Sequence, residues 1–182
     1  MNIVIVTEFP KALELNQVLY DKVTENLQAN VIANISSSTG IGARRTEFNL
    51  HKQKITEIDE LISWVQQILP DVSKKFATKT HDEEMGYNIN SFELAECWGS
   101  QYNKNESVVE HNHFPYALSF VYYVRTPKGA APIIIEDEIL NVKEGQCIFF
   151  LASQWHSVSQ NDCDERCVIA GNILYRFNNE IV

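Results

Sequence analysis

The chain has 182 residues, a length that suits one domain with a sizeable hydrophobic core. Hydrophobic residues make up 45 % of it and charged residues 21 %, an ordinary globular balance that argues against disorder. The net charge of −9 would repel phosphate backbones, so we expect no general nucleic-acid binding, although Arg44-Arg45 is a candidate for a local basic patch.

The sequence contains no sign of a membrane or secretory route. No apolar run approaches the length of a membrane span, and the first residues lack the basic start and cleavage site of a signal peptide. We therefore expect a cytoplasmic protein that does not bind membranes. In that compartment we expect reduced thiols at the four cysteines, Cys97, Cys147, Cys163 and Cys167.

The first half of the chain has helical periodicity. Residues 2–6 predict a short strand, and apolar residues on one face predict an amphipathic helix over residues 11–28. A second helix is expected from Thr56, where Asp59 three residues later resembles a capping box. We expect Pro70 to end this helix, since proline removes a backbone donor.

Two polar loops interrupt this half, at residues 35–47 and 78–90. Long polar loops beside a rigid scaffold often carry function, so we expect these two to act as lids over a site.

The second half is rich in Val, Ile, Phe and Tyr and has no helical period. Its candidate strands are 92–98, 107–113, 117–126, 132–137, 146–151, 156–159 and 166–177. Such a series predicts a sandwich or barrel, and the two helices would then lie on the outside of one sheet.

Three histidines of this half suggest a metal site. His111 and His113 alternate along a predicted strand, so both imidazoles would point to the same face. His156 begins another strand-like run and could supply a third ligand, which would leave one face of an iron centre open for a co-substrate. The alternative is that these are ordinary surface or core histidines. We assign no role to His51 or His81.

Arg166 suggests an anion near the same site. It opens the last strand-like run, and its planar guanidinium matches a carboxylate through two parallel hydrogen bonds. A buried arginine would need such an anion. The alternative is an exposed edge arginine that pairs with Asp164 or Glu165.

Several short motifs follow one another along the second half of the chain in the order of a known family. They are Glu96-Cys-Trp98, His111-x-His113, Ser119-Phe-Val-Tyr-Tyr123, Gly145, Phe149-Phe150, His156, Arg166 and Gly171-Asn172. Over roughly residues 92–175 the chain resembles the 2-oxoglutarate- and Fe(II)-dependent oxygenases related to prolyl hydroxylases. The resemblance implies an α+β fold, a double-stranded β-helix (jelly roll, cupin-like) with helices against one sheet. It also implies one oxygenase domain over 1–182, with a helical support region 1–90 and a jelly-roll core 91–177.

The resemblance also implies roles for individual residues. His111 and His156 would be iron ligands, and Arg166 would bind the distal carboxylate of 2-oxoglutarate. Tyr123 would donate a hydrogen bond to the same carboxylate, and Tyr102 would help to line the co-substrate pocket. The alternative for Tyr123 is that the Tyr122-Tyr123 pair merely reflects β-propensity, with one ring in the core and one outside.

His113 departs from the pattern of most related oxygenases, which have Asp or Glu there. Three neutral imidazoles would leave the full charge on the metal, although a His-x-His variant occurs in the subfamily that this chain resembles most. Either His113 is the third ligand, or another group completes the site, such as water, Glu136 or Asp137. We expect three histidine ligands.

The implied activity is that of a dioxygenase using Fe(II), 2-oxoglutarate and O2, with His111, His113 and His156 as the catalytic centre. It would hydroxylate a C–H bond of a peptide, protein or small molecule and release succinate and CO2. One alternative is a three-histidine cupin-type dioxygenase without 2-oxoglutarate, such as a thiol dioxygenase. Another is a non-catalytic jelly-roll binding or structural protein. The sequence is also compatible with a homodimer.

Overall fold

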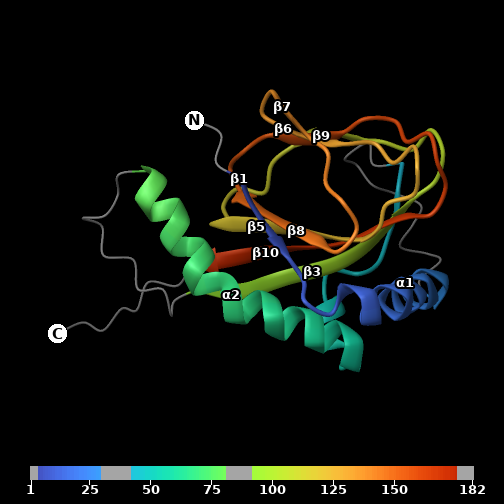
Figure 1. Cartoon of the computed structure of the whole chain (residues 1–182), viewed down its shortest axis with the longest axis horizontal. Helices are drawn as coiled ribbons and strands as arrows, with labels where there is room; N and C mark the ends of the chain where they lie inside the picture. Colours follow the sequence, from blue (N-terminus) through green and yellow to red (C-terminus); the bar gives the residue numbers. More distant parts are fainter. Residues whose placement is uncertain (1–3, 30–41, 81–91, 176–182) are drawn as a thin grey trace.

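The computed structural model describes residues 4–29, 42–80 and 92–175 (Figure 1). Their strands form two antiparallel sheets that face each other. The larger sheet has the order β1 (Val4–Glu8), β8 (Gln146–Leu151), β5 (Leu118–Arg125), β10 (Arg166–Tyr175), β3 (Phe92–Tyr102) and β2 (Arg44–Arg45). The smaller sheet has the order β4 (Val108–His111), β9 (His156–Val158), β6 (Ile133–Ile135) and β7 (Glu138–Leu140). The expected α+β double-stranded β-helix is therefore confirmed.

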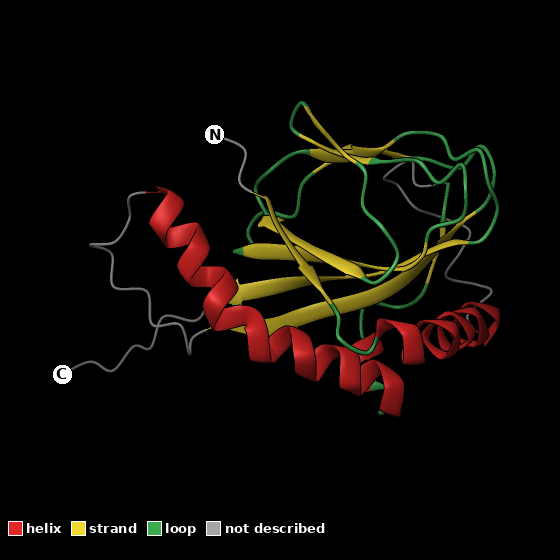
Figure 2. Cartoon of the chain, viewed as in Figure 1, coloured by secondary structure: helices red, strands yellow, loops and turns green. Residues whose placement is uncertain are grey.

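Two helices cover the outer face of the larger sheet (Figure 2). They are α1 (Ala12–Ala29) and α2 (Thr56–Thr80), and a short 3-10 helix, η2 (Leu50–Lys52), precedes α2. Both helices bury their apolar stripes, which include Leu19 and Val23 of α1 and Leu61 of α2. Helix α1 approaches β3 so closely that a Cβ added at Gly99 would lie 2.7 Å from a Val23 methyl group. The predicted position of the helices is confirmed.

The larger sheet separates two hydrophobic cores, because alternate residues of its strands face opposite ways. Tyr122 and Phe149 belong to the core under the helices, whereas Tyr123 and Phe150 belong to the core between the sheets. Both tyrosines are buried, so the alternative in which one ring of the pair lies outside is wrong. The hydroxyl of Tyr122 donates a hydrogen bond to Asn16 of α1, far from the space between the sheets.

A bulge in β3 changes which of its residues face the space between the sheets. Asn172 pairs with Glu96 and Ile173 with Leu94, so Ala95 is the extra residue. Leu94 consequently lies in the core under the helices, while Glu96 lines the space between the sheets. The bulge therefore places a carboxylate in the middle of the molecule.

The prediction that Pro70 ends the second helix is wrong, because α2 continues to Thr80. Proline removes one backbone donor, but the residues that follow it keep the apolar stripe. Val72 and Phe76 are buried at 2 % and 5 % exposure, and their burial outweighs the local cost of the proline. Ser73 also donates a hydrogen bond to the Leu69 carbonyl, at 2.7 Å.

The strands differ from expectation in three places. The predicted strand 132–137 is two strands, because Glu136 has a φ of 52° and turns the chain from β6 into β7. Strand β2 was not expected, and β3 is longer than the predicted 92–98. Of the two expected lid loops, 35–47 and 78–90, residues 35–41 and 81–90 lie outside the described residues.

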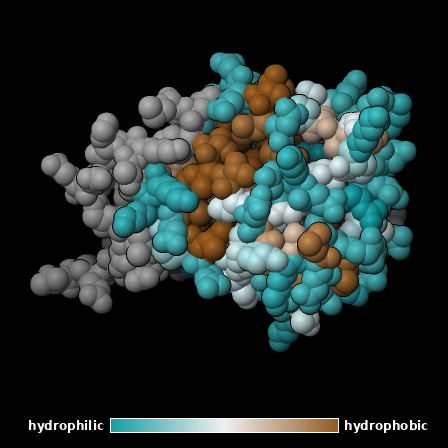
Figure 3. Space-filling view, in the orientation of Figure 1, coloured by the Kyte–Doolittle hydropathy of each residue, from teal (hydrophilic) through white to brown (hydrophobic). Residues whose placement is uncertain are grey.

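The surface carries an apolar band that runs past β1 and the β6–β7 hairpin (Figure 3). Exposed apolar side chains on these strands are Val6 of β1 and Ile139 of β7. Both β1 and β7 are edge strands of their sheets. None of the described helices is both long and apolar enough to span a membrane.

Candidate active site

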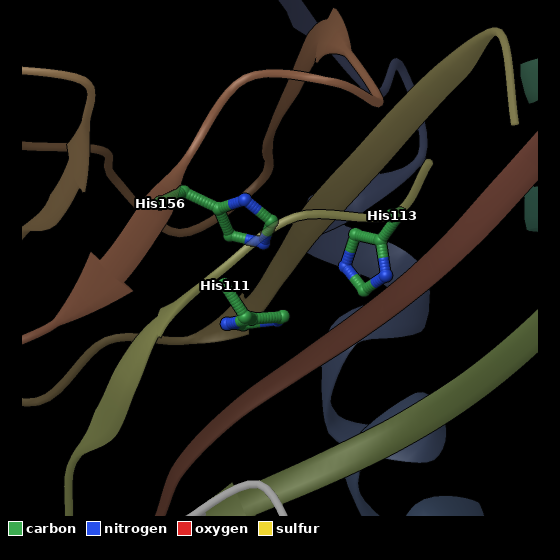
Figure 4. Close-up of side chains that lie close together, drawn as sticks. All are labelled: His111, His113 and His156. Atoms are coloured by element: carbon green, nitrogen blue, oxygen red, sulfur yellow. The ribbon is translucent and has the colours of Figure 1, made fainter. Parts of the chain in front are cut away.

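Three histidines meet between the two sheets (Figure 4). His111 ends β4 and His156 begins β9, and the two are cross-strand partners. His113 lies beyond the end of β4, where its backbone N–H donates a hydrogen bond to the Ala152 carbonyl at 2.7 Å. One ligand atom from each ring lies within 4.8 Å of the other two, so a single ion could be shared by all three.

Backbone carbonyl groups orient two of the three rings. Nδ1 of His111 lies 2.9 Å from the Val109 carbonyl oxygen, and Nδ1 of His156 lies 3.1 Å from that of Gln154. A carbonyl oxygen only accepts, so each Nδ1 carries the proton and each Nε2 presents its lone pair. This tautomer is the one that binds a metal through Nε2. Within the described part of the chain the His113 ring has no such hydrogen bond. It packs instead beside the Trp98 ring, with 5.7 Å between the two ring centres.

Burial keeps His113 and His156 neutral. Together with the smaller effect of the neighbouring His111, it lowers the pKa of His156 to about 3 and that of His113 to about 4. Neutral imidazole is the form that binds a metal ion. The site is therefore ready to accept a cation at neutral pH.

Among the described residues, no other group of three or more His, Cys, Asp or Glu side chains could hold a metal ion. Neither Glu136 nor Asp137 joins the histidines. The Glu136 carboxylate instead accepts a hydrogen bond from the Trp155 backbone, at 3.0 Å. The option that one of these carboxylates completes the metal site is therefore not supported by the geometry.

Arg166 is buried in the same space at 1 % exposure, and two of its donors, Nε and Nη1, have no hydrogen-bond partner among the described residues. Its guanidinium carbon lies 4.4 Å from the centre of the Tyr102 ring, with Tyr102 opposite it on β3. The alternative of an exposed edge arginine is wrong, because Glu165 pairs with Arg125 and Arg166 is not exposed.

Tyr123 lies beside this arginine, with its ring centre 5.6 Å from the guanidinium carbon. Its buried hydroxyl also has no acceptor in the described part of the chain. Burial, the largest effect, raises the pKa of Tyr123 and keeps the phenol a donor. Buried donors without acceptors are rare in folded proteins, so Arg166 and Tyr123 together indicate a site for an anion with carboxylate-like oxygens.

One cavity of about 340 Å³ joins the two sites, since the three histidines, Arg166, Tyr102 and Tyr123 all line it. All six residues singled out from the sequence are therefore brought together. The wall also contains residues that have no role in the sequence analysis, among them Arg45, Glu96, Phe114, Ser119 and Asn172. Arg45 was noticed only as part of a basic pair, and Glu96 and Asn172 only as parts of motifs.

No protein-family model matches this sequence, and no curated protein matches it. Solved structures do match its fold. A viral collagen prolyl hydroxylase from Paramecium Bursaria Chlorella virus-1, solved with 2OG, has a TM-score of 0.63 and 13 % identity, and the match covers 93 % of this chain and 94 % of that one.

Two further structures extend the comparison. A prolyl hydroxylase from Trichoplax adhaerens, in complex with a hypoxia inducible factor peptide fragment, has a TM-score of 0.57 and 11 % identity, covering 94 % of this chain and 84 % of that one. The non-heme alpha-ketoglutarate-dependent epimerase SnoN from nogalamycin biosynthesis has a TM-score of 0.60 and 13 % identity, covering 99 % and 83 %. The chain therefore has the fold of these oxygenases.

Proposed function

We propose that this chain is an Fe(II)- and 2-oxoglutarate-dependent dioxygenase that hydroxylates a C–H bond of its substrate and releases succinate and CO2. One observation carries the proposal: three imidazoles line one cavity with donors of Arg166 and Tyr123 that have no acceptor among the described residues. A metal site alone would fit several enzyme classes. A metal site beside buried donors for a carboxylate fits a co-substrate that binds a metal at one end and carries a carboxylate at the other.

The three histidines are the proposed iron ligands. His111 and His156 are held by backbone carbonyls, so their Nε2 atoms would lose little freedom on binding the ion. His113 is the proposed third ligand, in the place where most oxygenases of this fold have a carboxylate. When bound, Fe(II) with 2-oxoglutarate and dioxygen supplies the oxidation, in which the co-substrate becomes succinate and CO2.

Arg166 and Tyr123 are the proposed co-substrate anchors. The guanidinium fork would donate two hydrogen bonds to the distal carboxylate, and the Tyr123 hydroxyl would donate a third. The Tyr102 ring, beneath the guanidinium, keeps that fork in place. Apolar residues such as Phe150, whose ring lies 4.8 Å from that of His156, exclude water from the reacting end of the cavity.

The substrate is proposed to be a peptide, on the analogy that a prolyl hydroxylase of this fold was solved with a peptide fragment. The same fold also serves an epimerase, so a small-molecule substrate is the second candidate. We further propose that 1–182 works as one oxygenase domain, located in the cytoplasm.

The test is to titrate Fe(II) and 2-oxoglutarate into the protein without oxygen and then to measure succinate after oxygen is admitted. Both should bind, and wild type should form succinate, whereas His111→Ala should bind neither tightly. A three-histidine cupin-type dioxygenase is favoured instead if oxygen is consumed without 2-oxoglutarate. A binding protein is favoured if both molecules bind and no succinate forms with any of a panel of peptides and metabolites.

A further inference from the structure

Aromatic side chains line the cavity beside His113, since the centre of the Trp98 ring lies 5.7 Å from that of His113 and 5.1 Å from that of Phe48. These lining residues are Phe48, Trp98, Phe114 and Tyr116. Phe114 is 76 % exposed and Phe48 is 38 % exposed, which places them at the rim, whereas Trp98 is buried at 8 % exposure. This end of the cavity contains none of the anchors proposed for the co-substrate, so it is the part that a substrate would enter.

The Glu96 carboxylate lies in this part of the wall and is held by a row of hydrogen bonds across three strands. The Asn172 amide donates to Glu96 Oε2 at 3.0 Å, and Ser119 donates to the Asn172 oxygen at 2.9 Å. Asn172 and Ser119 are buried at 1 % and 2 % exposure, and the three residues are direct cross-strand neighbours. A carboxylate can only accept, so the Asn172 amide turns its NH2 group toward Glu96 and its oxygen toward the Ser119 hydroxyl. The row therefore fixes the orientation of the amide and holds the carboxylate in place.

We propose that Glu96 binds a cationic group of the substrate, an ammonium or a guanidinium, at the aromatic opening of the cavity. The inference rests on the proposed function in that the cation belongs to the molecule being oxidised. The Glu96 carboxylate accepts from Asn172 and is also hydrogen-bonded to the Tyr116 hydroxyl, and its two oxygens together offer about four lone pairs, so positions remain for N–H donors of a ligand. The neighbouring rings of Trp98 and Tyr116 favour a cation as well, since aromatic faces attract positive charge.

Arg45 brings a positive charge to the same opening. The guanidinium of Arg45 lies over the Phe48 ring, 4.1 Å from its centre, and therefore already uses one aromatic face. Burial, the largest effect, lowers the pKa of Arg45, and the charges of Glu47 and Glu96 act in the opposite direction. Arg45 thus partly balances Glu96, and a substrate cation would bind more strongly if Arg45 were neutral. The net charge of −9 attracts cations to the molecule from a distance.

The experiment compares two capped tripeptides that differ only at the centre, Gly-Lys-Gly and Gly-Gln-Gly. Each is titrated by calorimetry into protein saturated with Fe(II) and 2-oxoglutarate in the absence of oxygen. We expect the lysine peptide to bind about tenfold more tightly, because its ammonium would form a charge-assisted hydrogen bond with the Glu96 carboxylate. Glu96→Gln, which keeps the shape and the bond from Asn172, should abolish the preference, and Arg45→Gln should increase it.

Glu93→Gln is the matched control, since Glu93 lies on the same strand but outside the cavity wall, and it should keep the preference. Equal binding of the two peptides to wild type, or a preference that survives Glu96→Gln, would overturn the proposal. The titration is repeated without iron and co-substrate. A preference for lysine that depends on Glu96 in a protein that does not bind 2-oxoglutarate supports the cation site and rejects the proposed function.

Discussion

His111 and His156 are cross-strand partners whose imidazole rings lie 4.3 Å apart, and each ring is oriented by a carbonyl two residues before it in the chain. The two strands therefore hold the two rings in similar orientations, each with Nε2 free to bind a metal ion. His113 joins them from a loop and lacks this orienting bond among the described residues, so the three positions are not equivalent.

The first prediction ranks the three histidines by metal affinity. His111→Ala and His156→Ala should lower Fe(II) affinity more than His113→Ala, by about tenfold, because an orienting partner of a ligand is typically worth 10–100-fold. Calorimetric titration under argon measures the three constants. His51→Ala, outside the cluster, is the control and should bind the metal as wild type does. Equal losses at all three positions would contradict the ranking.

A second prediction concerns the missing carboxylate. His113→Asp places a negative charge where most oxygenases of this fold have one, and it should tighten Fe(II) binding because the charge offsets that of the ion. His113→Asn, of similar shape but neutral, is the matched control and should weaken it. Weaker binding by the aspartate than by the asparagine would mean that position 113 does not face the metal.

The third prediction concerns Arg166. Arg166→Met removes the proposed fork and should weaken 2-oxoglutarate binding by roughly 100-fold, as the loss of a buried charge pair does. Fe(II) affinity in the absence of 2-oxoglutarate should change little. The same substitution removes a buried charge without an acceptor, so the melting temperature of the ligand-free protein should rise. A fall in melting temperature together with unchanged 2-oxoglutarate affinity would make Arg166 a structural residue.

The sequence predicted the members of the site better than their geometry. His111 and His113 were placed on one strand by alternation, yet β4 ends at His111 and a shift in its pairing with β9 lies just before it. His113 reaches the cluster through a loop fastened to Ala152. The three histidines do lie together, as their spacing led us to expect, whereas the loop depends on a partner far along the chain.

Glu96 illustrates what a pattern cannot reveal. By alternation Leu94 and Glu96 would share a face of β3, and a carboxylate beside a core leucine suggests no role. The extra residue Ala95 separates them, and only the pairing with β10 shows this. Pro70 is the opposite case, since a sound local rule was outweighed by the burial of Val72 and Phe76.

The fourth prediction is a pH dependence of stability in the metal-free protein. Folding holds the pKa of His156 at about 3 and that of His113 at about 4, whereas an unfolded histidine titrates near 6.5. The unfolded chain thus binds more protons below about pH 6.5, and the free energy of unfolding falls as the pH is lowered. Urea denaturation at intervals between pH 7 and pH 5 measures this slope. In the double variant His113→Gln, His156→Gln the free energy of unfolding should change less with pH. The same slope as in wild type would show that these two histidines do not cause the pH dependence.

The last prediction tests the contact between α1 and β3 that supports the site from behind. A Cβ at Gly99 would lie 2.7 Å and 2.8 Å from the two methyl groups of Val23, so Gly99→Ala should destabilise the protein by about 1–3 kcal/mol, as overpacking does. Val23→Ala removes those methyl groups and leaves a gap in a fully buried place. The double variant should lose less stability than the two single losses combined, because the new methyl group fills part of that gap. Chemical denaturation of the four proteins measures this coupling, and strictly additive losses would show that α1 does not press on β3 at this point.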